Sequence, residues 1–195
     1  MTKLCCEVLA ALKGKQLVTA ESCTGGGIGA ALTAIPGSSE VYKGGIISYT
    51  NWVKHHLLNV DEALLEEVGA VSAPVAEAMA RGARNALDAD VAVSVTGLAG
   101  PGGDEFGNPV GTVFIGYCDE KTNFSKKYLF KGSREEIRTA AAREALKLVL
   151  DMNKQELLLK KSPVLPLTIS NCSPASMYPG RIVWAWKPSP PSTCG

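Results

Sequence analysis

Hydrophobic and polar positions along this chain follow two different periods. Short runs rich in β-branched residues recur, each bounded by Gly, Pro, Asn or Asp, and longer amphipathic stretches lie between them. Short alternating or continuous apolar runs favour strands, and apolar positions three to four residues apart favour helices. The succession of the two patterns predicts an α/β fold.

The pattern also predicts individual elements. The predicted strands are Gln16–Ala20, Gly45–Tyr49, Val91–Thr96, Gly111–Cys118 and Asn123–Phe130. The predicted helices are Thr2–Lys13, Gly25–Thr33, Asp61–Val68, Pro74–Leu87 and Arg134–Met152. The last two strands form a hairpin, because the turn-like residues 119–122 join them. Ser133 and Glu136 have the spacing of a capping box at the start of the last helix.

Composition changes near residue 153 and divides the chain. Seven of the eleven prolines follow this position, in a segment that is also rich in serine. A segment of that composition, without a sustained hydrophobic period, does not pack like the rest. We therefore expect one domain over residues 1–153 and a loosely ordered tail over residues 154–195.

Overall composition narrows the class of protein. The chain is 46% hydrophobic and 20% charged, with 20 basic and 19 acidic side chains. These fractions are typical of a globular protein, and a net charge of +1 gives no basic field for direct nucleic-acid binding. No apolar run is long enough for a membrane span and no cleavable signal is evident, so we expect a cytoplasmic protein without membrane partners. The six cysteines lack CxxC spacing, which disfavours a disulfide framework or a zinc site.

The most informative segment is Leu17–Gly27, where a strand runs into a polar turn and a glycine-rich helix start. In open α/β sheets, ligands bind at the carboxyl ends of strands, and free N–H groups at a helix start favour a phosphate or a developing oxyanion. A hydroxyl or thiol on this turn would be presented to such a ligand. In the alternative, Ser22 and Thr24 only cap the helix.

Several nucleotide-binding and hydrolase motifs are absent. The glycines after residue 26 lack the third glycine of GxGxxG, and no GxxxxGK[ST] occurs. Ser22 does not lie in a GxSxG elbow, and HExxH is missing. Dinucleotide-binding, P-loop, α/β-hydrolase and zinc-protease classes are therefore disfavoured.

A second cluster contains Tyr49 and Lys54, where a predicted strand end enters a polar loop. A lysine of lowered pKa, or a Tyr–Lys pair, can take a proton from serine without histidine. His55 and His56 are adjacent, so their side chains point apart and make a poor metal pair. In the alternative, Tyr49 is a half-buried aromatic residue and Lys54 is solvated.

Two further clusters complete the candidate chemistry. Residues Ser94–Gly103 form a β-branched strand that runs into a small, polar Gly/Pro loop, which can wrap a ligand or simply connect two strands. Arg134 and Arg138 lie four residues apart on one face of a helix start. Arginine suits bidentate phosphate binding, and surface ion pairing is the alternative.

Together these clusters, in this order and spacing, resemble the CinA carboxy-terminal domain family over about residues 3 to 153. The motifs that carry the resemblance are Ala20–Gly26, Pro36–Ser39, Tyr49–Lys54, Gly69–Ser72, Thr96–Pro101 and Pro109–Val113. The resemblance implies a three-layer α/β/α sandwich around a mixed β-sheet. Stand-alone members of the family are amidohydrolases that deamidate nicotinamide mononucleotide to nicotinic acid mononucleotide and ammonia, without metal or cofactor. Family members are commonly homo-oligomers.

The resemblance also assigns roles to residues. It implies that Ser22 is the nucleophile, that Tyr49 and Lys54 transfer its proton, and that backbone N–H groups around Cys23 to Gly26 stabilise the oxyanion. The family's loop hydroxyl falls on Thr96, and its helix-start arginine falls on Arg134 or Arg138. The substrate-binding residues expected on this basis are Cys23, Thr24, Gly25, Gly26, Asn51, Thr96, Gly97, Gly100, Arg134 and Arg138.

Two other hypotheses stay open on the sequence. The first is a non-catalytic nucleotide-binding or interaction module linked to competence or the DNA-damage response. The intact Ser22, Tyr49 and Lys54 favour the enzyme over this module. The second is an ATP-dependent nucleotide enzyme, which the missing P-loop disfavours.

Overall fold

The computed structural model describes residues 1–161 and centres on a five-stranded sheet. The strand order is β2 (Tyr42–Ile47), β1 (Leu17–Glu21), β3 (Val91–Gly97), β4 (Thr112–Cys118) and β5 (Asn123–Leu129). Strand β1 runs parallel to both β2 and β3, whereas β4 runs antiparallel to β3 and β5. The sheet is therefore mixed, and β4 and β5 form the predicted hairpin.

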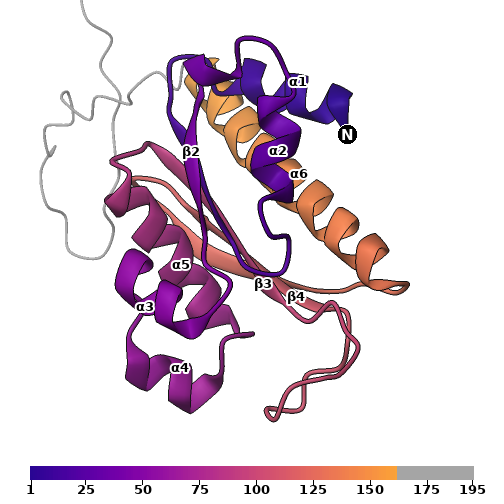
Figure 1. Cartoon of the computed structure of the whole chain (residues 1–195). Coiled ribbons are helices and arrows are strands. Elements are labelled where there is room, and N and C mark those ends of the chain that lie inside the picture. Colours follow the sequence, from indigo (N-terminus) through magenta and orange to yellow (C-terminus); the bar gives the residue numbers. More distant parts are fainter. Residues whose placement is uncertain (162–195) are drawn as a thin grey trace, which may run out of the picture. The chain divides into compact units, whose positions relative to one another are not determined.

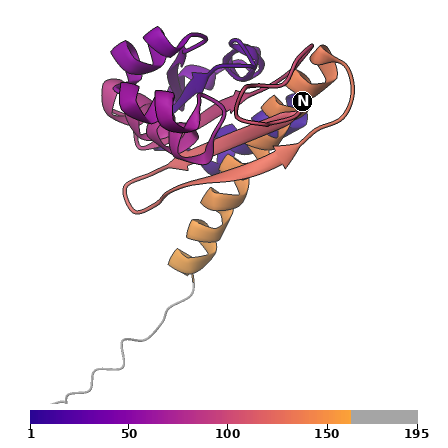
Figure 2. The same cartoon turned by 90° about the horizontal axis from the view of Figure 1, so that it is seen from below.

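Helices cover both faces of the sheet, as Figures 1 and 2 show from two directions. One layer contains α1 (Thr2–Ala11), α2 (Gly27–Thr33) and α6 (Arg134–Lys161), and the other contains α3 (Asn51–Leu58), α4 (Glu62–Val68) and α5 (Ala73–Ala86). A short 3₁₀ helix, η1 (Ser38–Glu40), precedes β2. This arrangement confirms the predicted three-layer α/β/α sandwich. Within the described residues, no helix combines the length and apolar character that a membrane crossing requires.

Side-chain size along β3 explains how the two layers pack. Successive side chains of a strand point to opposite faces. Val91, Val93 and Val95 belong to the hydrophobic cluster shared with α1, α2 and α6. The other face carries small side chains, including Ser94, whose hydroxyl donates to the Ala76 carbonyl at 2.5 Å. These small side chains allow α5 to lie close to the sheet.

The structure differs from the predicted elements at residues 51–58 and at the start of β2. Residues 51–58, read as a polar loop, form α3, in which Thr50 Oγ1 accepts the Val53 N–H at 3.3 Å as a helix cap. Strand β2 begins at Tyr42 rather than Gly45, because pairing with β1 extends it across two glycines that disfavour strands on their own. The capping box is confirmed, since Ser133 N–H donates to Glu136 Oε2 at 2.7 Å and Glu136 N–H to Ser133 Oγ at 3.3 Å.

The last helix also continues past its predicted end at Met152. Helix α6 reaches Lys161 because residues 153–161 contain good helix formers and the first proline of the tail is Pro163. The predicted tail is thus helical over residues 154–161. From residue 162 onward it lies outside the described residues.

Three parallel strands end at one edge of the sheet. In the register of β1, Glu21 is paired with Ile47 of β2 and with Val95 of β3. The segments that follow these positions carry Ser22, Tyr49 and Thr96. The topology therefore brings three of the sequence clusters to the same edge.

Candidate active site

A cavity of about 330 Å³ lies at this edge. Its wall is formed by the segments after β1 and β2, the end of β3 and the loop that follows it, α3, the connection between α4 and α5, and the start of α6. The lining residues are Ser22, Cys23, Tyr49, Asn51, Lys54, Ala70, Val71, Thr96, Gly97, Leu98, Ala99, Gly100, Gly102 and Arg134. Its volume lies in the range of small-molecule sites, roughly 300 to 1,000 Å³. The structure thus brings nine of the predicted site residues together. Thr24, Gly25, Gly26 and Arg138 do not line this cavity.

Ser22 and Lys54 are in direct contact at the bottom of the site. Lys54 Nζ donates to Ser22 Oγ at 3.2 Å and to the Ser48 carbonyl at 2.8 Å. Ser22 is 8% exposed and Lys54 only 1% exposed. The alternative of a solvated Lys54 is therefore wrong, because helix α3 turns this lysine inward.

Burial changes the acid–base behaviour of this lysine. Removal from water disfavours the charged ammonium and lowers the pKa of Lys54 from 10.5 to about 8, although the nearby Cys23 thiol acts in the opposite direction. Near neutral pH, an appreciable fraction of Lys54 is therefore an uncharged amine. An uncharged amine 3.2 Å from a serine hydroxyl can accept its proton.

The neighbouring thiol has the opposite character. Burial raises the pKa of Cys23 to about 11, more than the nearby Arg138 and Lys54 charges lower it. A thiol reacts as its thiolate, which is scarce at such a pKa. Cys23 thus stays a neutral wall residue, and Ser22 is the better nucleophile of the two.

The N–H groups at the start of helix α2 are bound by a side chain of the protein, the carboxylate of Glu21. Glu21 is 2% exposed, and its carboxylate accepts the N–H groups of Gly26 and Ile28, each at 3.0 Å, and of Gly29 at 2.9 Å. The sequence predicted free N–H groups here for a phosphate, and this expectation is wrong. The side chain of Glu21 fills the position that an anionic ligand would take.

The predicted capping residues do not cap this helix either. Its first turn follows Gly26, which adopts a left-handed φ of 94° and provides no side-chain cap. Thr24 Oγ1 is buried and has no hydrogen-bond partner among the described residues, and Ser22 Oγ contacts Lys54. The alternative that Ser22 and Thr24 merely cap α2 is therefore wrong.

Few backbone donors are left in residues 22–26. The N–H of Ser22 donates to Val95 O at 2.9 Å, and that of Gly25 donates to Ser22 O at 3.1 Å. Gly26 donates to Glu21. Within residues 1–161, the N–H groups of Cys23 and Thr24 donate to no other residue, and the Cys23 N–H lies near its own thiol sulfur. Of these two residues, Cys23 lines the cavity, so its N–H is the better placed donor for an oxyanion.

The two arginines at the start of α6 are used differently. Arg138 Nε and Nη2 donate to the carbonyls of Cys23 and Thr24, both at 3.0 Å, so this guanidinium holds the segment that carries Ser22. Arg134 instead lines the cavity, where its Nη1 donates to Gly100 O at 2.6 Å. Arg134 is therefore the one of the pair that a ligand can contact.

Tyr49 lies at the outer part of the site. Its side chain is 59% exposed, and its hydroxyl accepts from Arg134 Nη2 at 3.2 Å. No hydrogen bond joins it to Lys54 or Ser22 within the described part of the chain. Thr96 lies deeper, 1% exposed, with its hydroxyl donating to Ala70 O at 2.7 Å, which leaves its oxygen lone pairs free to accept.

Sequence reasoning missed the cavity-lining residues Ala70, Val71, Leu98, Ala99 and Gly102. It also missed Glu21 and Ser48, which support the site from outside the cavity. Glu21 precedes the helix by more than the three-residue spacing of a capping box, so no standard signal marks it as a cap. Ser48 acts through its main-chain carbonyl, which every residue possesses. Of these two supporting residues, a signal was present only for Glu21, as a charged residue at the end of an apolar strand.

Comparison with known families gives a consistent result. The family model described as the CinA C-terminal domain matches residues 2–153. Among related sequences, the chain is similar to a CinA-like protein of Desulfotalea psychrophila, with 48% identity over 137 residues, 70% of this chain and 33% of the relative. A CinA-like protein of Geobacter metallireducens is 50% identical over 133 residues, 68% of this chain and 32% of the relative. The chain spans about a third of the length of these relatives.

Solved structures agree with this match over nearly their whole length. A competence-damaged protein (CinA) superfamily protein from Klebsiella pneumoniae superimposes with a TM-score of 0.77 at 31% identity, covering 79% of this chain and 98% of that structure. The competence/damage inducible protein CihA from Agrobacterium tumefaciens gives a TM-score of 0.75 at 38% identity, covering 78% of this chain and 94% of that structure. The resemblance predicted from the motifs is confirmed.

Proposed function

We propose, from the premise that this chain belongs to the CinA C-terminal domain family, that it is a serine amidohydrolase acting on the carboxamide of nicotinamide mononucleotide. The products would be nicotinic acid mononucleotide and ammonia, so the enzyme would serve pyridine nucleotide recycling. The observation that carries the proposal is the contact between the buried Ser22 Oγ and Lys54 Nζ at the bottom of a ligand-sized cavity. A pair of this kind can perform acyl transfer without a metal or a cofactor.

The first half of the reaction forms an acyl-enzyme. Ser22 Oγ attacks the carboxamide carbon while its proton moves to the uncharged amine of Lys54. The oxyanion that develops accepts the N–H of Cys23. The C–N bond then breaks, and the Lys54 ammonium returns the proton to the departing nitrogen, which leaves as ammonia.

The second half releases the acid. A water molecule enters where ammonia left, Lys54 takes its proton, and the oxygen attacks the ester carbon. The ester C–O bond breaks and Ser22 Oγ regains the proton from Lys54. Lys54 returns to its starting form, so one water is consumed for each ammonia released.

The substrate phosphate would lie at the outer part of the cavity. The start of α2 is excluded because the Glu21 carboxylate occupies it and would repel a second anion. Arg134 lines the cavity and carries the charge that such a group needs, and the exposed Tyr49 lies next to it. Tyr49 contacts Arg134 and makes no hydrogen bond to Ser22 or Lys54 within the described residues. We therefore assign proton transfer to Lys54.

The test is ammonia release from nicotinamide mononucleotide by the full chain without added metal, with the product identified by chromatography. We expect turnover by the wild type and a loss of about a thousandfold or more in Ser22→Ala, because removal of a nucleophile leaves only binding and oxyanion stabilisation. Ser39→Ala is the matched control, since Ser39 is exposed in η1 and outside the cavity. A folded wild type that binds the nucleotide without releasing ammonia would contradict the proposal and favour a binding module.

A further inference from the structure

We propose that Glu21 is a positioning residue whose carboxylate fixes the segment carrying Ser22, and that it thereby maintains both the Ser22–Lys54 contact and the free N–H of Cys23. This inference rests on the proposed function for its substrate. Glu21 is not among the expected site residues and does not line the cavity of about 330 Å³. The residues that Glu21 contacts nevertheless lie on both sides of Ser22 in the sequence.

A buried carboxylate requires compensation, and here the main chain provides it. An unpaired carboxylate in the interior is costly, whereas one that accepts several N–H bonds at a helix start is stabilised. Glu21 Oε2 accepts from Gly26 and Ile28, and Oε1 accepts from Gly29 and from Thr19 Oγ1 at 3.4 Å. The Tyr42 hydroxyl contacts Thr19 Oγ1 at 2.8 Å and so orients that donor. All partners of the carboxylate are fixed in the fold.

These bonds anchor residues 22–26 at both ends. The segment begins at β1, where the Ser22 N–H is bound to Val95 O, and it ends at Gly26, whose N–H is bound to Glu21. Without the carboxylate, three N–H groups at the start of α2 would need other acceptors. The nearest alternatives in sequence are the carbonyls of residues 22–26 themselves, so a rearrangement would move Ser22 and change which N–H groups are free.

The same contacts distinguish the N–H groups that bind Glu21 from the Cys23 N–H, which is left for an oxyanion. The carboxylate takes the N–H groups of Gly26, Ile28 and Gly29, and within residues 1–161 the N–H of Cys23 donates to no other residue. An oxyanion donor is effective when it is oriented before the reaction, because no reorganisation is then needed. Glu21 thus acts on the reaction through the geometry of its neighbours and not by contact with the substrate.

A second cavity makes this role accessible to experiment. A hollow of about 220 Å³ is lined by Glu21 together with Thr19, Gly26, Gly29 and Tyr42, among others. Truncation of Glu21 to alanine would enlarge this hollow and leave the three N–H groups facing it. A small carboxylate such as formate can enter and accept the same bonds, whereas the neutral formamide cannot replace the charge.

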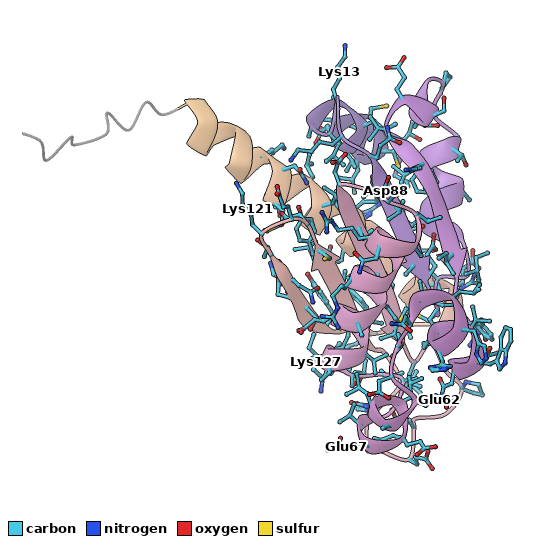
Figure 3. The ribbon with its side chains drawn as sticks, turned by 90° about the vertical axis from the view of Figure 1, so that its left-hand side faces the viewer. Lys13, Glu62, Glu67, Asp88, Lys121 and Lys127 are labelled. Carbon is cyan, nitrogen blue, oxygen red and sulfur yellow. The ribbon has the colours of Figure 1, made fainter. Side chains whose placement is uncertain are left out.

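The experiment compares Glu21→Gln and Glu21→Ala with Glu67→Gln, a matched control on an exposed glutamate of α4 that Figure 3 labels at the surface. Two rates are measured on folded protein: ammonia release from nicotinamide mononucleotide, and covalent labelling of Ser22 by a fluorophosphonate, which requires no natural substrate. We expect Glu21→Gln to lose about tenfold to a hundredfold in kcat and in labelling rate, with KM within about threefold of wild type. Glu67→Gln should match the wild type in both.

Formate should raise both the ammonia-release rate and the labelling rate of Glu21→Ala by at least about tenfold, and formamide should raise neither. A merely structural role would lower the folded fraction without such rescue. If Glu21→Ala does not fold, Glu21→Gln decides alone. Rates in folded Glu21→Gln within twofold of wild type would overturn the positioning role.

The two proposals can fail separately. Normal labelling of Ser22 in a wild type that releases no ammonia would overturn the proposed substrate, while slower labelling in Glu21→Gln would still support the positioning role. A wild type that shows neither ammonia release nor labelling would overturn both.

Discussion

The inner wall of the cavity and its outer rim are built in opposite ways. On the inner wall, Ser22, Lys54 and Thr96 are each at most 8% exposed, and main-chain groups hold them. On the rim, Tyr49 is 59% exposed and Arg134 is also exposed, and the two contact one another. The inner groups are held by the sheet and its helices, whereas the rim groups are long side chains in water.

Under the proposed function, this difference separates the residues that perform chemistry from those that recognise the substrate. A general base needs a stable distance to its nucleophile and a shifted pKa, and burial provides both. A rim that meets a charged, soluble ligand needs accessible donors instead, and its exposed ion pairs and hydrogen bonds contribute little to stability. Changes on the inner wall should therefore affect kcat, and changes on the rim should mainly affect KM.

The largest effect is expected for Lys54→Met, which removes the base and keeps much of the side-chain volume. Activity should fall at least about a thousandfold, because no other base in residues 1–161 contacts Ser22. The same change should raise the free energy of unfolding by about 1 to 3 kcal/mol at pH 7, since a pKa lowered by burial means that the charged lysine destabilises the folded state. Urea unfolding together with ammonia release would measure both.

The pH dependence of this stabilisation gives a check on its cause. The folded-state pKa of about 8 lies below the unfolded value of 10.5, so the wild type gains stability as pH rises between these values. The advantage of Lys54→Met should therefore shrink above pH 8. Lys13→Met, at an exposed lysine labelled in Figure 3, should change stability by less than about 0.5 kcal/mol.

The two arginines contrast a residue that supports the inner wall from behind, Arg138, with one on the rim, Arg134. Arg138→Ala should lower kcat by about tenfold to a hundredfold, because it frees the carbonyls of Cys23 and Thr24. Arg134→Ala should raise KM by about tenfold or more with a smaller change in kcat, because it removes the charge at the rim. Steady-state kinetics of both variants would decide, and an identical kcat and KM pattern in the two would contradict the division.

The pH dependence of the reaction rate should be moderate and should reflect the titration of Lys54 on the inner wall. The uncharged form of Lys54 increases about tenfold between pH 7 and pH 9 for a pKa of about 8, so kcat/KM should rise by a similar factor. The second pKa of a phosphate monoester lies near 6, below this window. A profile that is flat from pH 7 to pH 9 would remove Lys54 as the base.

The smallest effect is expected for Tyr49→Phe on the rim. Loss of its hydroxyl removes one hydrogen bond to Arg134, so KM should rise only about twofold to fivefold. The pH–rate profile should match that of the wild type. A lost or shifted limb of the profile would return Tyr49 to proton transfer.

Much of this architecture follows from the sequence, and the exceptions have local physical reasons. The sequence predicts β3 and β4 from their β-branched runs, because strands buried on two faces are continuously apolar. It predicts α5 and α6 from their helical period, because helices buried on one face carry apolar residues three to four positions apart. Helix α3 was missed because Trp52, Val53 and the two histidines are weak helix formers, and its position depends on packing against α5. Gly82 allows that approach, since a Cβ there would collide with the Leu58 carbonyl.

The candidate site was predicted as a set of residues but not as a geometry. Spacing placed Ser22, Lys54 and Arg134 on separate elements and gave no reason to choose Arg134 over Arg138 as the ligand contact. The fold distinguishes them, because α6 brings Arg138 against residues 22–26 and Arg134 against the cavity. The role of Glu21 depends on main-chain hydrogen bonds that residue types do not reveal.

The two helical layers have a consequence for when this chain can be active. Lys54 comes from α3 on one face of the sheet, and Arg138 comes from α6 on the other, while Ser22 lies between them. Under the proposed function, a chain in which either layer has not yet docked lacks the base or the support of the nucleophile segment. Newly made molecules would then be inactive until both faces of the sheet are covered, so that activity would report complete folding.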